Sequence, residues 1–511
     1  MLDYRAPLML CCRENNSVST GGTEMKTLEE LRKLHRDCPS VNRIPIHRDM
    51  PADLLTPVSA YLKLTAKSTL ANSFLLESVT GGEKIGRYSF LGSNPVNTLR
   101  IDAGDCDPLN ILQQKLAQIV YPDRKYLADL PDFTGGAVGF ISYDCVRFFE
   151  PASDVAGIQD PMELPDAIFM FCDAFVIFDH LHHLVKVVSH VVLDGITDIE
   201  TAYARATESI NEICALLESP DTPQPRNAAA PAEPSEWSSN VGQKGYQEYV
   251  QKIKEQIKLG NVIQCVPSQQ TSKTTHIHPF NAYRRLRSLN PSPYMFYIHF
   301  EGDIQLVGAS PEMLVKVDSS RHVYTHPIAG TRKRGATPAE DDAQAADLLA
   351  DFKERSEHIM LVDLGRNDVN RVCKPETVAL DSLMHIERYS HVMHIVSHVS
   401  GTLRDDRDAY DAFRSVFPAG TVSGAPKISA MRIIYQLEGA KRGVYAGAVG
   451  SFGYGGTIDT CIAIRTMVFT RGRVFLRAGG GIVWDSVPED EWFETVNKLG
   501  SNVAVINALE E

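Results

Sequence analysis

The hydrophobic residues in the first part of the chain form short, dense runs that predict β-strands and one long helix. The apolar run 168–178 and the alternating run 184–193 flank a polar segment at 179–183, which is typical of a β-hairpin. The next run, 199–217, repeats its apolar residues at helical spacing and predicts an amphipathic helix. Residues 40–217 are therefore predicted to form one globular block.

The later part of the chain, residues 241–511, combines the same two kinds of pattern. Strands are predicted at 296–299, 305–308, 313–317, 445–452, 461–469 and 474–478. Helices are predicted at 246–259, where Gly260 ends the pattern, at 343–372, which Gly365 could interrupt, and at 489–499. Because strands follow one another in runs and helices gather in separate groups, we expect an α+β fold with large antiparallel sheets.

A segment over 218–240, between the two blocks, has the composition of a linker. Its central part, SPDTPQPRNAAAPAEP at 219–234, is rich in Pro and Ala and poor in large apolar residues. Residues 1–39 are predicted to be an N-terminal extension, disordered in part. Met25 opens the first helical pattern, which makes it an alternative start of the functional chain.

The charge and the cysteines narrow the classes of partner and location. The chain carries 51 Lys and Arg against 64 Asp and Glu, a formal net charge of −13, without a basic block. We therefore expect no nucleic acid and no anionic membrane surface as a partner, and an anionic substrate would need a locally positive site. No apolar run approaches the roughly 18 residues of a membrane span. The 10 cysteines include no C-x-x-C pair, which indicates a reducing compartment, and we expect a cytoplasmic location.

Two pairs of glutamates are the first candidates for chemistry. Glu354 and Glu357 lie three residues apart in one predicted helix, and Glu491 and Glu494 repeat this spacing in another. Buried carboxylates need a cation or a proton, so the two helices together could form an oxygen-rich Mg²⁺ site. The alternative is that each pair belongs to a solvated helix face, and spacing alone does not show that the two helices meet.

Glycine-rich loops and one histidine are the next candidates. Three consecutive glycines at 479–481 would let backbone N–H groups approach an anion, although a tight turn needs them equally. The loops 327–332 and 418–427 combine Gly, Thr and cationic residues, as loops around a small polyanion do, but they could also simply connect elements. His394 lies in an apolar run, where a histidine is more often a core residue than a catalyst.

Taken together, these segments resemble the chorismate-utilising enzyme family. The motifs occur in the family's order over nearly all of the chain: SFLLES at 73–78, RYSFLG at 87–92, GGAVGFISYD at 135–144, PIAGT at 327–331, EHIMLVDLGRND at 357–368, HVMHIVS at 391–397, FPAGTVSGAPK at 417–427, RGVYAGAVG at 442–450, CIAIRT at 461–466, AGGGIVWDS at 478–486 and DEWFETVNKL at 490–499. Within the family, the chain is most similar to component I of the anthranilate synthases, in its eukaryotic, fungal-like form. The resemblance implies two interlocked blocks, a regulatory one over 40–217 and a chorismate-binding one over 241–511.

Two positions sort the family by reaction. Aminodeoxychorismate synthases of the family carry a lysine nucleophile where this chain has Ala329, and isochorismate synthases carry a lysine base where it has Gln264. The resemblance therefore implies that ammonia is the nucleophile, delivered by a glutamine amidotransferase on a separate partner chain in a hetero-oligomer. The alternatives are an aminodeoxychorismate synthase and a non-catalytic paralogue that binds a regulator without turnover.

The resemblance also implies a role for each motif residue. Glu357 and Glu494 would bind Mg²⁺, with Glu491 acting through water, and Glu354 would protonate the leaving C4 hydroxyl of chorismate. His394 would assist the elimination of pyruvate. Gln264 and Thr421 are included with the catalytic residues, and the expected substrate-binding residues are Gly330, Thr331, Tyr445, Arg465, Gly479, Gly480, Gly481 and Lys498.

Feedback inhibition by tryptophan is the last implication of the resemblance. The family's inhibitor-site motif corresponds to Leu76, Glu77 and Ser78, and its second wall corresponds to Pro293, Tyr294 and Met295. Glu77 would pair with the amino group of tryptophan. The alternative is that these are ordinary strand and turn residues.

Overall fold

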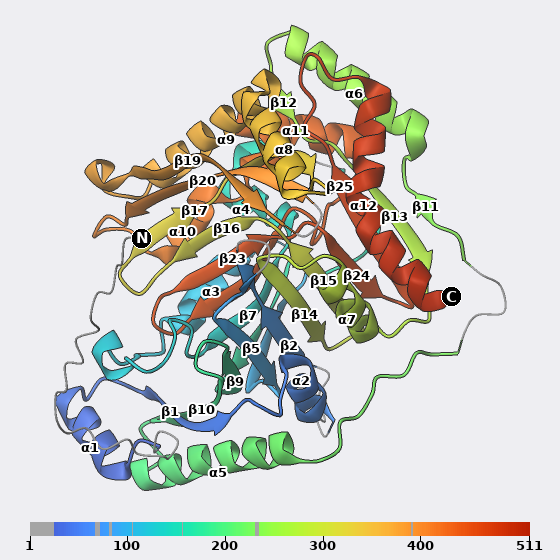
Figure 1. Cartoon of the computed structure of the whole chain (residues 1–511). Helices are drawn as coiled ribbons and strands as arrows, with labels where there is room; N and C mark the ends of the chain where they lie inside the picture. The colour runs from blue at the N-terminus through green and yellow to red at the C-terminus, as the bar shows by residue number, and fades with distance from the viewer. Residues whose placement is uncertain are drawn as a thin grey trace, which may run out of the picture.

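The computed structural model describes residues 25–66, 72–80, 84–104, 106–155, 157–229, 235–389 and 392–511. Two large antiparallel sheets dominate it (Figure 1). The first has the strand order β1 (Arg43–Pro51), β10 (Leu184–Val192), β9 (Ala174–Asp179), β5 (Tyr88–Ser93), β2 (Ser73–Glu77), β14 (Tyr294–Phe300), β15 (Ile304–Ser310), β24 (Thr466–Thr470), β25 (Arg473–Gly479), β13 (Ser268–Thr274) and β11 (Ser238–Ser239).

The second sheet contains the strands that lead toward the candidate site. Its order is β18 (Ile328–Lys333), β20 (Val392–Thr402), β17 (His322–Thr325), β16 (Met313–Val317), β23 (Ile458–Ile462), β22 (Ala448–Gly453), β7 (Gly136–Ile141), β8 (Ala167–Cys172) and β6 (Asn97–Ile101), and β19 (Ala379–Arg388) also pairs with β20. The small pairs β12 (Gln264–Cys265) with β21 (Gly424–Ala425) and β3 (Val79–Thr80) with β4 (Lys84–Ile85) complete the strands described. The predicted α+β fold with large antiparallel sheets is therefore confirmed.

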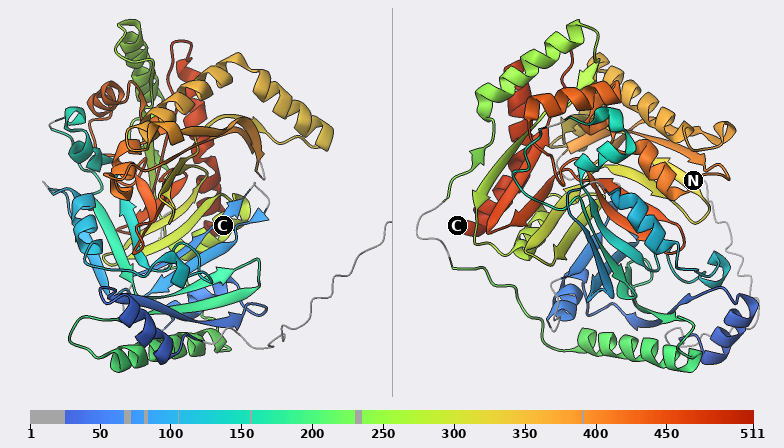
Figure 2. Two further views of the ribbon diagram at one scale, coloured as in Figure 1. Left: turned by 90° about the vertical axis from the view of Figure 1, so that its left-hand side faces the viewer. Right: turned by 180° about the vertical axis from the view of Figure 1, so that it is seen from behind.

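The two sheets pack face to face, and helices cover their outer faces. Alternate residues of facing strands, such as Phe140 of β7 and Phe296 of β14, fill the core between the sheets. The outer face of the first sheet packs against α1 (Leu28–Asp37), α2 (Pro57–Thr65), α5 (Ile199–Glu218), α7 (Pro279–Leu289) and α12 (Pro488–Glu510). That of the second sheet packs against α3 (Pro108–Leu116), α9 (Phe352–Asn370), α10 (Ala409–Val416) and α11 (Lys427–Glu438). The views from the side and from behind show helices outside the strands (Figure 2).

Several elements of the sequence prediction differ from the structure in an informative way. The hairpin of β9 and β10 is present, with Leu184 opposite Asp179. The apolar run 168–178, however, is two strands, β8 and β9, which lie in different sheets and separate at Asp173. The predicted strand 461–469 likewise divides into β23 and β24. Both runs are largely apolar because each half is buried in a sheet of its own, and the polar residues lie where the halves separate, at Asp173 and at Arg465.

The long helix predicted over 343–372 is two helices, and the expected interruption at Gly365 was wrong. The break lies at Asp351, between α8 (Pro338–Ala350) and α9. Asp351 caps α9, since its carboxylate accepts hydrogen bonds from the backbone N–H groups of Lys353 and Glu354. Gly365 lies inside α9, where an added Cβ would make only ordinary contacts. The other predicted helices are longer than expected: α6 (Gly242–Lys258) and α12 extend beyond their patterns.

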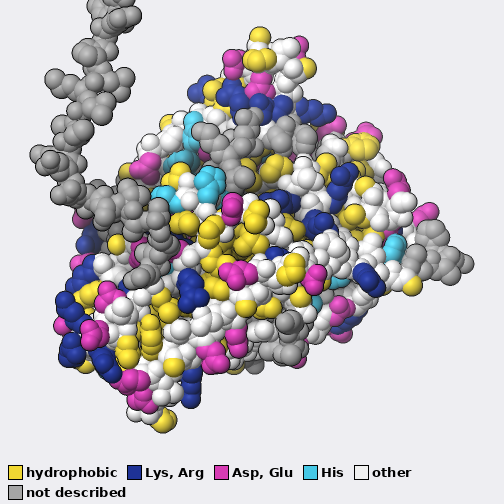
Figure 3. Space-filling model, turned by 60° about the horizontal axis from the view of Figure 1, so that its bottom comes forward, with side chains coloured by type: hydrophobic (Ala, Val, Ile, Leu, Met, Phe, Trp, Pro, Cys, Tyr) yellow, Lys and Arg dark blue, Asp and Glu magenta, His cyan; other side chains and the backbone are white. Residues whose placement is uncertain are grey.

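The remaining sequence predictions concern the ends and the surface. Residues 1–24, which include most of the predicted N-terminal extension, lie outside the described residues, as does His391; α1 occupies the rest of that extension. In the described part of the chain, no helix is long and apolar enough to cross a membrane. On the face in Figure 3, acidic and basic side chains are intermixed around hydrophobic ones near the centre.

Candidate active site

The glycine turn at the end of β25 lies between the two helices that carry the glutamate pairs. A Cβ placed on Gly480 would lie 3.0 Å from Glu491 Oε2 and 3.6 Å from Glu494 Oε1, both of α12. A Cβ placed on Gly481 would lie 3.2 Å from Glu357 Oε1 of α9. The absence of side chains in the turn therefore lets the carboxylates of both helices approach the same short segment of backbone.

Gln264 of β12 connects this turn to α9. Its buried side chain donates a hydrogen bond of 2.7 Å from Nε2 to Glu357 Oε1, and Nε2 lies 2.5 Å from where a Cβ of Gly481 would be. Burial raises the pKa of Glu357, and the hydrogen bond from Gln264 opposes part of that rise. Gln264 thus favours an ionised carboxylate in a partly dry site.

Two cations face these carboxylates from the other side. Lys498 of α12 lies 2.6 Å from Glu494 Oε1 through its Nζ, which also donates to the carbonyl oxygen of Gly479 at 2.9 Å. Arg465 donates to the backbone carbonyl of Lys498 at 2.8 Å, and burial lowers the pKa of its guanidinium. These two cations are the positive groups that an anionic substrate could meet beside the glutamates.

His394 of β20 is held by the loop around Gly330. Its Nδ1 lies 2.9 Å from the carbonyl oxygen of Gly330 and 3.1 Å from the hydroxyl of Thr331. Because a carbonyl oxygen only accepts, Nδ1 carries the proton and Nε2 is left as a base. Burial lowers the pKa of His394 to about 4, so the imidazole is neutral near pH 7.

Glu354 lies against the same glycine. A Cβ on Gly330, whose φ is +69°, would lie 3.1 Å from Glu354 Oε2. Burial raises the pKa of Glu354, and the nearby Arg332, at 3.5 Å from its Oε1, opposes this rise. The rise favours the protonated form of the carboxyl group, which is the form that a general acid needs.

Tyr445, one of the predicted substrate-binding residues, lies beside a charged network that the sequence analysis did not assign. The Glu438 carboxylate lies 2.6 Å from Arg442 and 2.5 Å from Arg477, and all three side chains are buried. Both guanidinium groups lie within 6 Å of the Tyr445 ring centre, and its hydroxyl lies 3.1 Å from where a Cβ of Gly479 would be. The regular spacing of Glu438 and Arg442 at the end of a helix was the available signal.

Glu312 is a further residue that the sequence analysis missed. It lies between β15 and β16, where the chain crosses from one sheet to the other, and is only 6% exposed. Burial raises its pKa to about 8, and the hydroxyl of Thr421 and the backbone N–H of Ile328 oppose this rise. A lone acidic residue between two apolar strands was the signal that could have identified it.

The carboxylates fit a hard divalent cation, although they do not surround a single point. Among the residues described, Glu357, Glu491 and Glu494 are not a set whose oxygens all lie within 4.8 Å of one another. Oε2 of Glu491 is buried without a hydrogen-bond partner, and burial raises the pKa values of both Glu357 and Glu491. Mg²⁺ uses one or two carboxylates with water and substrate oxygens, so a buried excess of acceptors suits it.

The six residues predicted to bind tryptophan lie together, away from these glutamates. They line one cavity of about 530 Å³, between β2, β14 and the second sheet; they are Leu76, Glu77, Ser78, Pro293, Tyr294 and Met295. The Glu77 carboxylate accepts two hydrogen bonds from Arg287, at 2.8 and 2.9 Å, and one from Tyr283 at 2.5 Å. Any ammonium group that pairs with Glu77 must therefore join or displace Arg287.

Comparison with known proteins gives the family. Residues 71–504 match the model of the chorismate binding enzymes. A relative from Schizosaccharomyces pombe, described as a probable anthranilate synthase component 1, is 50% identical over 489 residues, which cover 96% of this chain and 97% of the relative. The chain belongs to the chorismate binding enzyme family.

Two further comparisons agree with this membership. Anthranilate synthase component 1 of Saccharomyces cerevisiae is 46% identical over 96% of either chain. The crystal structure of anthranilate synthase component I from Streptococcus pneumoniae superposes with a TM-score of 0.72 at 35% identity, covering 89% of this chain and 99% of that one. The predicted resemblance to the fungal form within the chorismate binding enzymes is thereby confirmed, and the large subunit's role in converting chorismate is supported.

Proposed function

We propose that the chain is the large subunit of an anthranilate synthase, a lyase that converts chorismate and ammonia to anthranilate, pyruvate and water. This would make it the enzyme of the first committed step of tryptophan biosynthesis, acting in the cytoplasm. The hydrogen bond between Gln264 and Glu357 is the main structural support. The amide of Gln264 is committed to a carboxylate, and Ala329 offers only a methyl group, so neither position supplies a nucleophile or a base. The nitrogen must then come from outside the chain.

The proposed reaction assigns distinct proton transfers to two residues. Glu354, whose pKa is raised by burial, donates a proton to the departing C4 hydroxyl while ammonia adds at C2. Neutral His394 assists the later loss of pyruvate through its unprotonated Nε2. The two proton transfers therefore use different residues, both of which lie beside Gly330.

The remaining predicted residues would hold the substrate and the metal. Tyr445, Arg465 and the backbone N–H groups of the 479–481 turn would bind the enolpyruvyl carboxylate, and Gly330, Thr331, Thr421 and Lys498 would line the rest of the pocket. Glu357 and Glu494, with Glu491 acting through water, would hold Mg²⁺. When bound, Mg²⁺ would neutralise the ring carboxylate of chorismate.

A glutamine amidotransferase subunit is the proposed source of ammonia. Several large apolar side chains are exposed on or just before the two helices that carry the glutamates: Phe352 at 85%, Ile359 at 52%, Trp484 at 54% and Phe493 at 49%. Exposed apolar side chains are typical of a protein interface. A partner seated over these helices would release ammonia close to the glutamates.

Tryptophan is the proposed feedback inhibitor, and the cavity beside Glu77 is its proposed site. The cavity is largely apolar, as an indole requires, and Glu77 and Arg287 at its edge offer opposite charges for the ammonium and carboxylate groups of an amino acid. Inhibition requires that tryptophan bind one of two conformations of the subunit more tightly.

The test is incubation of the chain with chorismate, Mg²⁺ and an ammonium salt, followed by anthranilate fluorescence. Anthranilate should form without the partner, whereas glutamine should serve as nitrogen donor only after the amidotransferase is added. Accumulation of 4-amino-4-deoxychorismate would reassign the reaction. Absence of turnover together with tight tryptophan binding would favour the non-catalytic paralogue. Glu357→Ala is the matched inactive control, because it removes a proposed metal ligand.

A further inference from the structure

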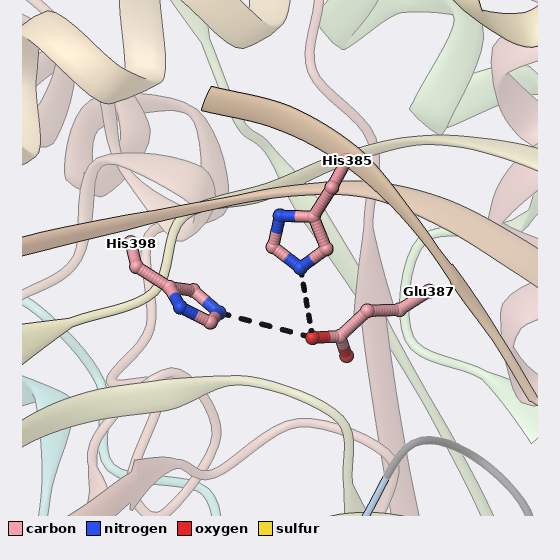
Figure 4. Close-up of side chains that lie close together, drawn as sticks. All are labelled: His385, Glu387 and His398. Atoms are coloured by element: carbon pink, nitrogen blue, oxygen red, sulfur yellow. Dashed lines mark hydrogen bonds and ion pairs between the residues drawn. The ribbon is translucent and has the colours of Figure 1, made fainter. Parts of the chain in front are cut away.

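A cluster of two histidines and one glutamate lies on β19 and β20, and the proposed reaction does not use it. His385 and Glu387 alternate on β19, so they face the same side of the sheet, and His398 joins them from β20 (Figure 4). One ligand atom from each residue lies within 4.8 Å of the other two. Among the described residues, no other group of three or more His, Cys, Asp and Glu side chains has its ligand atoms this close together.

We propose that His385, Glu387 and His398 form a binding site for a divalent first-row transition metal such as Zn²⁺, separate from the Mg²⁺ site proposed on α9 and α12. Two imidazoles and one carboxylate suit such metals, whereas Mg²⁺ prefers oxygen ligands alone. The two sites would therefore differ in the class of cation that they select.

The distances fit a metal with little movement. His385 Nε2 lies 3.2 Å and His398 Nε2 lies 3.8 Å from the same oxygen, Oε1 of Glu387. Zn²⁺ holds nitrogen and oxygen ligands at about 2.1 Å, so neighbouring ligands of a tetrahedral site lie about 3.4 Å apart. His398 Nε2 is buried and faces this oxygen from beyond hydrogen-bond distance, with no hydrogen-bond partner among the described residues, so a metal could take the place of that contact (Figure 4).

The surrounding residues orient the ligands as outer partners do in metal sites. The Ser382 hydroxyl lies 2.8 Å from Nδ1 of His385, which leaves Nε2 facing the cluster. The Tyr389 hydroxyl donates to Glu387 Oε2 at 2.7 Å, which leaves Oε1 facing the histidines. The ring of His326 stacks on that of His398 with centres 3.9 Å apart. Each ligand is therefore held by a partner that does not compete for the metal.

The backbone is bent at the place where the cluster forms. The register between β19 and β20 shifts between Ser382 and His385, and Met384, inside the shift, has a φ of +53°. A non-glycine residue in the left-handed region is strained, and such strain persists only where neighbouring contacts maintain it. The Met384 N–H donates to the Ser397 hydroxyl at 2.9 Å, which holds the bend in place. The bulge turns His385 toward the strand that carries His398.

The site would have an open side. Glu387 and His398 line the cavity of about 530 Å³ that is also lined by the six residues predicted to bind tryptophan. A metal held by three protein ligands keeps a coordination position for water or for a small ligand with an amine or carboxylate group. That position would face the cavity.

The experiment is equilibrium dialysis of the full chain against micromolar Zn²⁺, with Mg²⁺ in excess to fill the carboxylate site. We expect His385→Ala and His398→Ala each to bind one Zn²⁺ fewer than the unmodified chain. His322→Ala is the matched control, because His322 lies on β17 of the same sheet, outside the cluster, and its Nε2 lies 3.3 Å from the Thr402 hydroxyl. The His322→Ala chain should bind as many Zn²⁺ ions as the unmodified chain. When Co²⁺ replaces Zn²⁺, the unmodified chain should bind the same number of ions and show the absorption of a low-coordinate site.

A second variant tests whether weaker Zn²⁺ binding reflects the cluster itself and not a loss of the fold. Ser382→Ala removes the partner of His385 without removing a ligand, and it should weaken Zn²⁺ binding about 10- to 100-fold. Zn²⁺ should also raise the unfolding temperature of the unmodified chain but not that of His398→Ala. Equal Zn²⁺ binding by all variants, or no binding at micromolar Zn²⁺, would mean that the cluster is a hydrogen-bonded network only and would overturn the proposal.

Discussion

Gln264 donates its side-chain N–H to Glu357 across the candidate active site, joining a two-residue strand to a helix 93 positions further along the chain. Gln264→Leu would remove that donor and leave Glu357 buried beside the other glutamates, so its pKa should rise further. Metal binding needs the ionised form, and a charged hydrogen bond is worth about 1.5–3 kcal/mol. We therefore expect kcat/KM at pH 7 to fall about 10- to 100-fold.

The pH profile separates this effect from a general disturbance. The acidic limb of kcat/KM should move to higher pH in Gln264→Leu, and activity should partly return at pH 8–9. Gln256→Leu is the control, since the side chain of Gln256 accepts a hydrogen bond from Asn261 near the end of α6, outside the candidate site. A uniform loss of activity at every pH would contradict the proposed effect on Glu357.

His394 should remain neutral throughout the range in which the enzyme works. Its pKa of about 4 lies below the usual 6.5, so the unfolded chain takes up a proton at this residue before the folded chain does. The free energy of unfolding should therefore fall as the pH drops from about 6.5 to 4, and His394→Asn should reduce that slope. The same variant should lose about 10²- to 10⁴-fold in kcat. Nuclear magnetic resonance of the imidazole would reveal an ordinary titration near pH 6.5 if this account is wrong.

The contribution of Glu312 to stability should depend on pH in the opposite direction to that of His394. Its folded-state pKa of about 8 lies above the ordinary 4.5, so its contribution to stability is complete below pH 4.5 and is lost as the pH rises through 8. Glu312→Gln mimics the protonated form, and it should be more stable than the unmodified chain at pH 9 by a few kcal/mol at most, on the order of 1.4 per pKa unit. The exposed Glu376→Gln is the control, and chemical denaturation at pH 5 and pH 9 is the measurement.

Inhibition by tryptophan should depend on Glu77. Glu77→Gln removes the charge that would pair with the ammonium group of tryptophan, so the concentration for half-inhibition should rise about 10- to 100-fold. Because Arg287 and Tyr283 also lose a charged partner, the thermal stability of the variant must be measured alongside. Arg32→Gln, which breaks an exposed ion pair with Glu200, is the matched control. Unchanged inhibition in a folded Glu77→Gln chain would remove the cavity from the proposal.

The sequence predicted the class of fold because the buried strands are apolar and the hairpins are short. The hydrophobic pattern did not show where a largely apolar run changes sheets, since both halves of such a run are equally hydrophobic. Asp173 was the available sign of the change between β8 and β9: it is buried, accepts a hydrogen bond from Tyr454 at 2.9 Å and lies 2.6 Å from Arg43. Asp351 was likewise the available sign of a helix start, because Asp is a good N-cap, whereas an isolated glycine can remain inside a helix.

The candidate site was predictable in its parts and not in its assembly. Helical spacing placed Glu354 with Glu357, and Glu491 with Glu494, but no local pattern shows that α9 and α12 face the same glycine turn. Family resemblance supplied that relationship. The cluster of His385, Glu387 and His398 escaped both kinds of reasoning, because it needs a bulge in one strand to meet a residue of the next.

The exchange of strands between the two blocks has a consequence for how the chain can be cut. β2 of the first block pairs with β14 of the second, and β7 pairs with β22, so each sheet is built from both sides of the 218–240 segment. A protease acting within that segment should yield two fragments that migrate together under native conditions and separate only in denaturant. Neither fragment expressed alone could complete a sheet, whereas the two expressed together could reconstitute the whole molecule.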